Sequence, residues 1–463
     1  MAEIVVVGAG AAGSALAGRL VERGADVLLL EAGTAERPPE VRDVGSLAAT
    51  LPDHPWNWAY PVLLRRGTPA VVPRGRGLGG STAINGAVWT RAVPADADGW
   101  GVPGWTYEEL LPYFVRAERD LDEQGPRHGA DGPVPVRRPA GQLRHATVDR
   151  FLAAAERLGY PAEPDKNAGG PPGAGPVPSN SLDGVRVDAA TAYLGPRVRV
   201  RTGAVVTRVR LQGSRATGVE LAGGEIVEAG QVVLAAGAVA TPQILLRSGI
   251  GPAGPHELPV GQGFSDHPAV YLPMRTDDPP AHPHAPIAQA ALHLDTGADP
   301  AGDVWVLQFV RPFAAGGDLH LMCALGLPHG RGELTLHPAD PAGPPRIEYR
   351  YLQEESDRRR MRHAVRTAAE LLRAGLGTRT APDGDVLGVD HRLDGWIAAH
   401  LTTAVHMCGT AAIGRVVDAE LRVYGIEGLR VADTSVLPTV PRRGTAATAV
   451  AIGEKAADLV AGA

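Results

Sequence analysis

Short apolar runs and one helical pattern alternate over the first thirty residues. Residues 4–7 (Ile-Val-Val-Val) and 27–30 (Val-Leu-Leu-Leu) are continuous apolar runs, as expected for strands of a buried parallel sheet. Between them apolar residues recur at four-residue spacing from Ala12 to Leu20, and Gly24 stands where a helix ends. The pattern predicts a strand–helix–strand unit.

A glycine motif joins the first run to the helix. Gly8, Gly10 and Gly13 form G-x-G-x-x-G, and Glu31 ends the second run. Gly8 permits a tight turn, Gly10 lets the backbone approach a pyrophosphate, and Gly13 allows close helix–strand packing. The helix N-terminus would face the phosphates, and Glu31 would bind ribose hydroxyls. The motif predicts a dinucleotide site, and Ala32 and Gly33 after the acid favour FAD over NAD.

Further patterns predict elements along the rest of the chain. They indicate a hairpin over 201–220 with its turn at 213–214, a buried strand at 232–234, and helices over 105–118 and 445–460. The Pro- and Gly-rich residues 161–178 are expected to form a mobile loop, and Arg358-Arg359-Arg360 the solvated face of a helix.

Composition narrows the class of protein. The 463 residues suit two domains, and 44 % hydrophobic with 21 % charged residues is ordinary for a globular chain. A net charge of −6 gives no indication of nucleic-acid binding. Cys323 and Cys408 stand far apart, so neither a disulfide framework nor a metal site is expected. No membrane span or signal peptide is recognised, which predicts a cytoplasmic location.

Several segments together resemble the glucose–methanol–choline (GMC) oxidoreductases. Residues 73–86 (PRGRGLGGSTAING) and 237–252 (GAVATPQILLRSGIGP) look like the two signatures of that family, and 260–268 is similar to the segment that follows. The pattern continues from His406 to residue 455. The ending Arg-Arg-Gly-Thr at 442–445 resembles an actinobacterial subgroup that includes mycofactocin-associated members.

The resemblance implies an α/β fold in which a Rossmann-like FAD-binding domain is interleaved with an α+β substrate-binding domain. The first domain would use residues 1–33, 74–95, 190–265 and 404–463, the second 96–189 and 266–403, with 34–73 covering the flavin. The N-terminus of helix 445–460 would point at the flavin. The backbone of Val206 would contact the adenine. The residues expected to bind FAD are Gly8, Gly10, Ala11, Ala12, Gly13, Glu31, Ala32, Gly79, Gly80, Ser81, Asn85, Gly86, Val206, Ala236, Gly237, Asp433 and Thr445.

His406 falls on the family's active-site histidine, and an imidazole suits removal of a hydroxyl proton near neutral pH. The family normally has a second His or Asn eleven residues beyond Asp433, but Gly444 stands there. Arg443, Thr445, Cys408 or a polar group of the substrate would have to replace it.

Two other positions depart from the family pattern. Ile84 stands where some members carry the histidine that bonds to the flavin, so FAD is expected to be non-covalent. Ala269 stands where choline-oxidising members carry a glutamate, which argues against choline as the substrate.

Three functions remain open. The leading hypothesis is an FAD-dependent oxidoreductase that moves a hydride from an alcohol carbon of a small molecule to flavin N5, with oxygen or a carrier as electron acceptor. A non-redox lyase of the same fold is the second. A module that passes electrons to a carrier protein or quinone is the third.

Overall fold

In the computed structural model, which describes residues 2–313, 316–340 and 342–462, the predicted strand–helix–strand unit is present. It consists of β1 (Ala2–Val7), α1 (Ala11–Glu22) and β2 (Val27–Leu30). The strands β1 and β2 are parallel, as their continuous apolar runs indicate. Gly24 has a φ of +87° just after the helix, the conformation expected of a residue that ends one.

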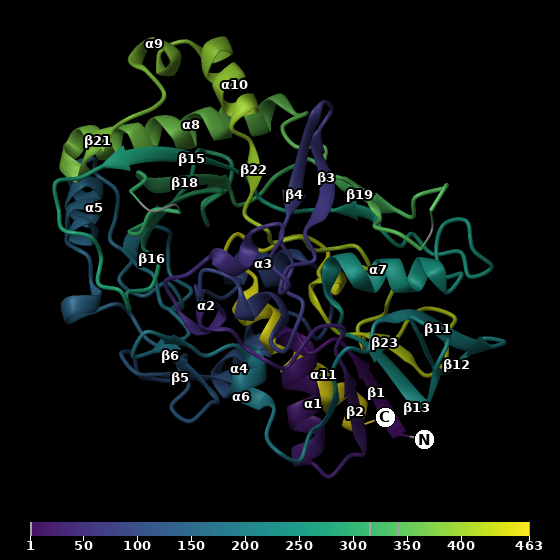
Figure 1. Cartoon of the computed structure of the whole chain (residues 1–463). Coiled ribbons are helices and arrows are strands. Elements are labelled where there is room, and N and C mark those ends of the chain that lie inside the picture. Colours follow the sequence, from purple (N-terminus) through teal and green to yellow (C-terminus); the bar gives the residue numbers. More distant parts are fainter. Residues whose placement is uncertain (1, 314–315, 341, 463) are drawn as a thin grey trace.

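This unit lies in the sheet that we call the N-terminal sheet (Figure 1). Its order is β10-β2-β1-β13-β12-β11, with β23 paired to β13. Strands from three distant parts of the chain therefore lie side by side. The additional strands are β10 (Arg199–Arg201), β11 (Val206–Gln212), β12 (Arg215–Leu221), β13 (Ile226–Leu234) and β23 (Leu429–Val431). The pair β11–β12 is the predicted hairpin, with its turn at 213–214.

A second sheet, which we call the wall sheet, has the order β21-β15-β18-β17-β16-β7, with β22 paired to β15. One of its faces packs against α5 (Ala146–Arg157) and α8 (Glu355–Leu371), and the opposite face carries Trp305, Leu307 and Phe309. Its strands are β7 (Ala174–Pro176), β15 (Pro268–Arg275), β16 (Ala288–Leu294), β17 (Val304–Phe309), β18 (Leu319–Leu325), β21 (Thr378–Arg379) and β22 (Thr402–Thr403).

A third sheet links these regions in the order β14-β19-β20-β3-β4, and two short pairs complete the strands. The third sheet contains β3 (Tyr60–Arg65), β4 (Thr68–Val72), β14 (Gln262–Phe264), β19 (Gly332–Thr335) and β20 (Arg346–Glu348). The short pairs are β5 (Glu118–Asp120) with β6 (Val134–Val136), and β8 (Ser181–Leu182) with β9 (Val185–Arg186).

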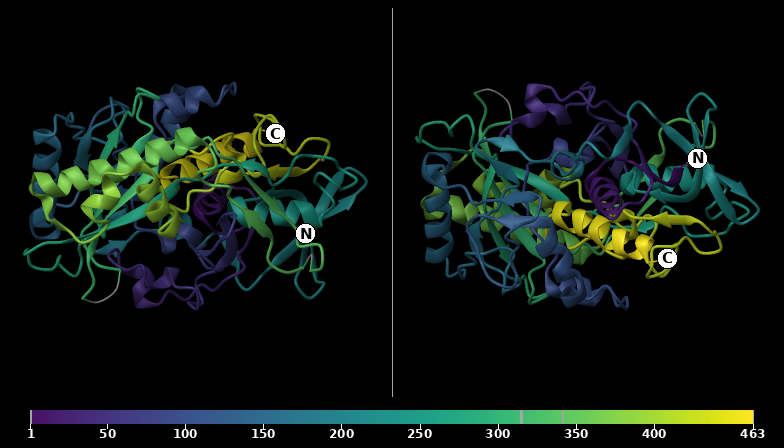
Figure 2. Two further views of the ribbon diagram at one scale, coloured as in Figure 1. Left: turned by 90° about the horizontal axis from the view of Figure 1, so that it is seen from above. Right: turned by 90° about the horizontal axis from the view of Figure 1, so that it is seen from below.

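The helices cover the sheets on several sides. In Figure 2, α8 (green) lies toward the viewer when the molecule is seen from above, and α11 (yellow) when it is seen from below. The helix α11 packs along α1, where a Cβ at Gly453 would lie 2.2 Å from the carbonyl oxygen of Ala12. Besides α1, the α-helices of the described residues are α2 (Pro39–Arg42), α3 (Pro94–Gly99), α4 (Tyr107–Ala117), α5 (Ala146–Arg157), α6 (Ala189–Tyr193), α7 (Gly237–Arg247), α8 (Glu355–Leu371), α9 (Gly384–Leu387), α10 (Asp390–Ala399) and α11 (Ala446–Ala461).

Side-chain burial departs from two expectations. Residues 161–178 are packed into the molecule: they contribute β7 to the wall sheet and bury Glu163, Lys166 and Asn167. Arg360 is only 2 % exposed and pairs with Asp357 and Asp303, so the basic run is not a uniformly solvated face. Burial of these charges depends on partners that are distant in the sequence.

Candidate active site

A cavity of 680 Å³ lies between the N-terminal sheet and the wall sheet. This volume is within the range of about 300–1,000 Å³ that is usual for ligand and cofactor sites. One end is lined by the loop between β1 and α1, and the other by residues of the wall sheet. The cavity therefore joins the predicted dinucleotide motif to a second compartment.

The dinucleotide end has the properties required for binding a diphosphate. The helix α1 begins at Ala11 with no side-chain cap on its first N–H groups and no acidic residue in its first turn. Free N–H groups at a helix N-terminus favour an anion. Gly8 has a φ of +101°, and a Cβ there would lie 2.6 Å from the carbonyl oxygen of Ala235. The turn therefore requires glycine at Gly8.

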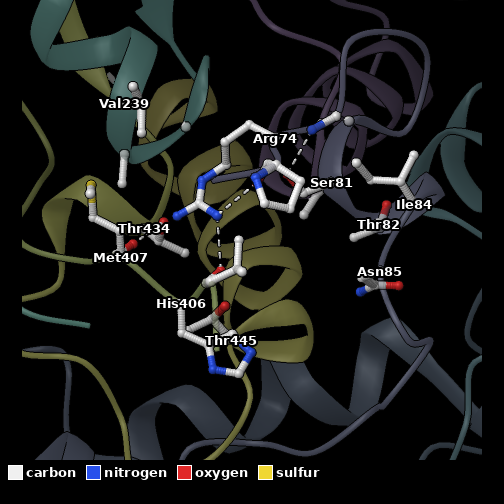
Figure 3. A pocket seen from close by; sticks show the side chains of 18 of the residues that line it. Arg74, Ser81, Thr82, Ile84, Asn85, Val239, His406, Met407, Thr434 and Thr445 are labelled. Carbon is white, nitrogen blue, oxygen red and sulfur yellow. Dashed lines mark hydrogen bonds between the residues drawn. The ribbon is translucent and has the colours of Figure 1, made fainter. Parts of the chain in front are cut away.

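Most of the predicted cofactor residues line the cavity, and Figure 3 shows several of them around it. Gly13 and Gly79 do not line the cavity and lie behind the residues that do. A Cβ at Gly13 would lie 1.9 Å from the carbonyl oxygen of Gly8, so Gly13 permits α1 to approach β1. Gly79 has a φ of +96° and packs against Asp188. The residues that line the cavity are Gly8, Gly10, Ala11, Ala12, Glu31, Ala32, Gly80, Ser81, Asn85, Gly86, Val206, Ala236, Gly237, Asp433 and Thr445.

Two buried carboxylates hold the backbone around the dinucleotide end. The oxygens of Glu31 accept hydrogen bonds from the N–H groups of Ala9 (2.9 Å) and Gly33 (2.8 Å). Asp433 accepts from the N–H of Gly237 at 2.8 Å. Burial raises the pKa of both carboxyl groups. Each Glu31 oxygen accepts one of these bonds and keeps a lone pair for a ligand. Asp433 Oδ2 also accepts from the Thr241 hydroxyl at 2.6 Å, whereas among the described residues its Oδ1 accepts only from the N–H of Ser435 and keeps a lone pair.

The catalytic candidate His406 follows a strained residue. Val405 has a φ of +67°, a conformation that is rare for a β-branched side chain and costs about 1–3 kcal/mol. Two contacts hold this segment. The Arg74 side chain crosses the cavity and donates to the carbonyl of Val405 at 3.2 Å (Figure 3), and the N–H of His406 donates to Asp266 Oδ1 at 2.7 Å. The strain is therefore offset by contacts that fix the direction of His406.

The His406 ring is also fixed. Its Nδ1 lies 3.0 Å from Nδ1 of His267, a fully buried residue. On its other side, Nε2 would be 3.8 Å from a Cβ built on Gly444. Burial, followed by the nearby His267 and Arg74, lowers the pKa of His406 well below its ordinary value. Burial lowers the pKa of His267 to about 4, so both imidazoles are neutral near pH 7.

We call the compartment beside this ring the His406 chamber. Alternate residues of β17 face it because successive side chains of a strand point to opposite faces. The rings of Trp305 and His406 lie 6.4 Å apart. The chamber is lined by Val88, Thr90, Val177, Tyr271, Ala288, Ala291, His293, Trp305, Leu307, Phe309, Met322, His406, Arg443 and Gly444.

The structure distinguishes among the residues considered as replacements for the missing side chain at Gly444. Arg443 and Thr445 line the cavity. Cys408 is fully buried outside it, and its thiol donates to the carbonyl of His406 at 3.2 Å. Sequence reasoning did not identify Thr90, His293 or Trp305. The alternation of large apolar residues over 305–309 was a signal for Trp305, whereas nothing local marked the other two.

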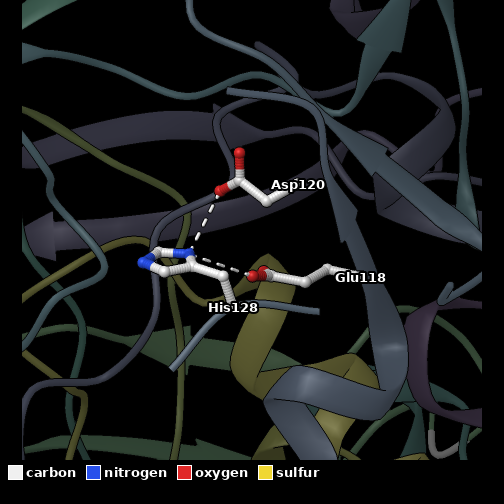
Figure 4. Close-up of side chains that lie close together, drawn as sticks. All are labelled: Glu118, Asp120 and His128. Atoms are coloured by element: carbon white, nitrogen blue, oxygen red, sulfur yellow. Dashed lines mark ion pairs between the residues drawn. The ribbon is translucent and has the colours of Figure 1, made fainter. Parts of the chain in front are cut away.

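A separate polar cluster contains Glu118, Asp120 and His128, whose potential ligand atoms lie within 4.8 Å of one another (Figure 4). Arg91 pairs with Glu118, and Arg138 pairs with Asp120 at 2.6 Å. The neighbouring carboxylates of Asp120, Asp165 and Glu118 raise the pKa of His128 to about 11. A protonated imidazole has no lone pair for a metal. The geometry therefore supports a network of ion pairs.

Comparison with known proteins identifies the family. A family model described as GMC oxidoreductase matches residues 2–269, and a second with the same description matches residues 328–453. The chain belongs to the GMC oxidoreductases. The predicted resemblance is confirmed, and the chain is an FAD-dependent oxidoreductase of the GMC type.

Relatives and solved structures cover the whole chain. The "uncharacterized GMC-type oxidoreductase in thcA 5′ region" of Rhodococcus erythropolis is 38 % identical, over 100 % of this chain and 98 % of that one. An oxygen-dependent choline dehydrogenase of Rhizobium rhizogenes is 31 % identical, over 100 % and 96 %. The crystal structure of pyridoxine 4-oxidase from Mesorbium loti has a TM-score of 0.91 at 28 % identity and covers 100 % of both chains. These likenesses confirm the predicted α/β GMC fold.

The cofactor end fits FAD because it combines a helix N-terminus without a side-chain cap, glycines at the closest approaches and a long cavity. Ile84 lines the cavity and offers no nucleophile to the flavin. Within the described part of the chain, no helix is both long and apolar enough to cross a membrane.

Proposed function

We propose that this enzyme oxidises the CH–OH group of a small molecule and that His406 is the base that removes the hydroxyl proton. The position of His406 carries the proposal. Its backbone and Nδ1 are held by Asp266 and His267, while Nε2 faces the space left by Gly444. A hydroxyl in that space would lie within reach of Nε2.

The partner His267 supports the tautomer that a base requires. Two neutral nitrogens 3.0 Å apart share one proton, so one ring donates and the other accepts. The proposed role of His406 requires that His267 Nδ1 accept this hydrogen bond. The His267 proton then lies on Nε2, a buried atom that has no hydrogen-bond partner among the described residues. His406 then donates from Nδ1 and keeps the lone pair of Nε2 for the substrate hydroxyl.

The remaining groups hold the cofactor and exclude water. The residues proposed to bind FAD are those predicted above, with Gly13 and Gly79 acting through the shape of the wall. FAD, when bound, supplies the acceptor for the hydride of the alcohol carbon. The apolar side chains of the wall sheet cover His406 and keep its imidazole neutral. We propose non-covalent binding because Ile84 cannot form the link known in some members.

The interleaved division of the chain predicted from the resemblance remains our proposal. The FAD-binding domain would use residues 1–33, 74–95, 190–265 and 404–463, and the substrate-binding domain 96–189 and 266–403. The position of the cavity between the N-terminal sheet and the wall sheet supports this division.

Replacing His406 with Ala tests the role of the base. H406A is expected to retain bound FAD and to slow anaerobic flavin reduction by about 10²- to 10⁴-fold, the range for loss of one general base. Stopped-flow absorbance of the flavin measures this single turnover. The control is H363A, which removes an exposed histidine of α8 and is expected to react like the unmodified enzyme. Unchanged reduction in H406A would remove His406 from the mechanism.

The same anaerobic experiment separates the other hypotheses. Bleaching of the flavin by an alcohol supports oxidation, whereas turnover without bleaching favours the non-redox lyase. Comparison of turnover with oxygen and with an artificial acceptor then identifies the partner that reoxidises the flavin.

A further inference from the structure

Four charged or polar side chains form a buried cluster at the edge of the His406 chamber, which we call the Arg443 cluster. Its members are Arg443, Glu163, Lys166 and His293, and none is more than 7 % exposed. Arg443 donates to Glu163 Oε1 at 2.6 Å and to His293 Nδ1 at 2.9 Å. Lys166 donates to Glu163 Oε2 at 2.5 Å and lies 3.2 Å from His293 Nδ1. The cluster joins the 161–178 segment, β16 and the loop before α11.

Two of these side chains, Arg443 and His293, line the cavity next to the proposed base. Arg443 directly precedes Gly444, which faces His406. His293 is the cross-strand partner of Trp305, whose ring lies 6.4 Å from that of His406. Directly opposed residues of an antiparallel pair project on the same face, so His293 and Trp305 form adjacent parts of one wall.

The charges of the Arg443 cluster do not balance among the described residues. Arg443 and Lys166 are cationic groups, and Glu163 is the single carboxylate that they contact. Burial lowers the pKa of His293 to about 3, so this ring adds no charge near pH 7. Burial, and to a smaller extent the charge of Arg443, lowers the pKa of Lys166 to about 7, so an anion beside the cluster would favour the protonated amine. A buried charge without a partner is costly, and an anion would relieve that cost.

The cluster around His128 provides an internal comparison. There the carboxylates Glu118, Asp120 and Asp165 face three cations, Arg91, Arg138 and protonated His128, so the charges match. None of those six residues lines the cavity. The cluster around His128 thus has equal numbers of positive and negative charges and does not reach the cavity. The Arg443 cluster has more cationic groups than carboxylates, and two of its side chains line the His406 chamber.

The open side of the Arg443 cluster presents donors. The Arg443 guanidinium can only donate, so Nδ1 of His293 accepts a hydrogen bond from it. The carboxylate of Glu163 could instead accept a proton from this Nδ1, but it lies farther away, at 3.3 Å. The proton of neutral His293 therefore sits on Nε2, which has no hydrogen-bond partner in the described part of the chain. The two bonds of Arg443 use two of the five donors of a guanidinium.

We propose that Arg443 and His293 bind a carboxylate of the substrate, so that this enzyme acts on alcohols that carry a carboxylate beyond the reacting carbon. The inference rests on the proposed function and names its substrate class. A carboxylate carries one negative charge, which matches the positive charge in excess when Lys166 is protonated, and it pairs well with the planar guanidinium fork of Arg443. A cationic alcohol such as choline would meet repulsion at the same place.

Matched ligands test binding without turnover. The holoenzyme is titrated with benzoate, benzyl alcohol and benzylammonium, and binding is followed by the change in the visible flavin spectrum. Benzoate is expected to bind at least about tenfold more tightly than benzylammonium. In R443M this preference is expected to fall by about tenfold or more, the loss typical of one charge-assisted hydrogen bond. R443K, which keeps the charge without the fork, is expected to lie between the two.

The control variant R359M removes an exposed arginine of α8 and is expected to keep the full preference. Equal binding of benzoate and benzylammonium by the unmodified enzyme overturns the proposal and requires no variant. Tighter binding of phenyl phosphate than of benzoate would overturn the assignment to a carboxylate. A changed flavin spectrum in R443M with unchanged ligand preference would also overturn it, because Arg443 would then serve the cofactor.

Turnover separates this inference from the proposed function. Anaerobic flavin reduction is compared for 4-(hydroxymethyl)benzoate, benzyl alcohol and 4-(hydroxymethyl)benzylammonium, and the first is expected to react most efficiently. Equal rates for all three would support alcohol oxidation and overturn the carboxylate site. Arg443-dependent binding of benzoate without reduction by any alcohol would support the site and contradict the proposed function.

Discussion

Gly444 leaves the proposed base without a side chain opposite it. A Cβ at this position would lie 3.3 Å from Oγ1 of Thr90 and 3.8 Å from Nε2 of His406. Its φ is outside the left-handed region, so the backbone does not require glycine there. The glycine therefore matters through the space that it leaves. Empty space beside a buried ring is costly unless something fills it, and we expect the substrate to do so.

Substitution of Gly444 tests this explanation. G444H is expected to reduce turnover of bulky alcohols by at least about tenfold, because the imidazole occupies their space, a steric cost above about 1.4 kcal/mol. Slow oxidation of small primary alcohols should remain. G444A, which adds only one methyl group, is the control and should reduce turnover far less. Steady-state rates for both sizes of alcohol measure the effect, and intact turnover of the bulky alcohol in G444H would contradict the size argument.

At the residue scale, the sequence identified the parts of the site that lie in local motifs. The glycines of the first turn and His406 were predicted because their neighbours in the chain carry the signal. Trp305 and His293 come from β17 and β16, and their approach to His406 depends on how these strands pair. Arg443 was considered only as one replacement among several. Its partners Glu163 and His293 are distant in sequence, so its role follows from the fold.

At the element scale, the contact between α1 and α11 determines how closely two cofactor-binding segments approach. Gly453 lies within α11, and a Cβ there would lie 2.2 Å from the carbonyl oxygen of Ala12. Gly395 lies within α10, is exposed, and has no atom within 4 Å of the corresponding Cβ position. The two glycines share a helical setting and differ in their surroundings.

Replacement of each glycine by alanine should therefore have opposite effects. G395A is expected to stabilise the protein by about 0.5–1 kcal/mol, since alanine has the higher helix propensity. G453A is expected to lower the thermal midpoint and to weaken FAD binding, because α11 must move away from α1. Thermal melts and flavin retention on gel filtration measure both effects. If G453A were as stabilising as G395A, the close packing of α1 and α11 would not limit the fold.

Whether the sequence predicted an element depended on how local its pattern was. The unit β1–α1–β2, the hairpin β11–β12 and the helix α11 were predicted, because each has its own periodicity and turn residues. Residues 161–178 were not, since many prolines and glycines indicate a loop but do not reveal that Glu163 and Lys166 are buried within it. Arg360 was misjudged for the same reason: its partner Asp303 lies in another part of the chain.

At the scale of the whole molecule, the chain crosses repeatedly between its sheets. The N-terminal sheet takes strands from the beginning, middle and end of the sequence. The segments between them supply the wall sheet, whose strands fall within residues 174–403. A buried arginine, Arg442, pairs with Asp96 of α3 and with Asp299 near the wall sheet. Loss of either sheet would therefore remove strand connections and ion pairs from the other.

We expect this interleaving to make the two sheets unfold together. Flavin fluorescence, which rises when FAD is released, and tryptophan fluorescence should report one transition at the same temperature. R442M leaves Asp96 buried and unpaired, a change that typically costs about 3–5 kcal/mol, so it should lower both midpoints equally. The control R422M breaks a surface pair with Asp418 and should cost no more than about 1 kcal/mol. Two separate transitions, or a shift of only one signal in R442M, would show that the sheets are independent units despite the crossings of the chain.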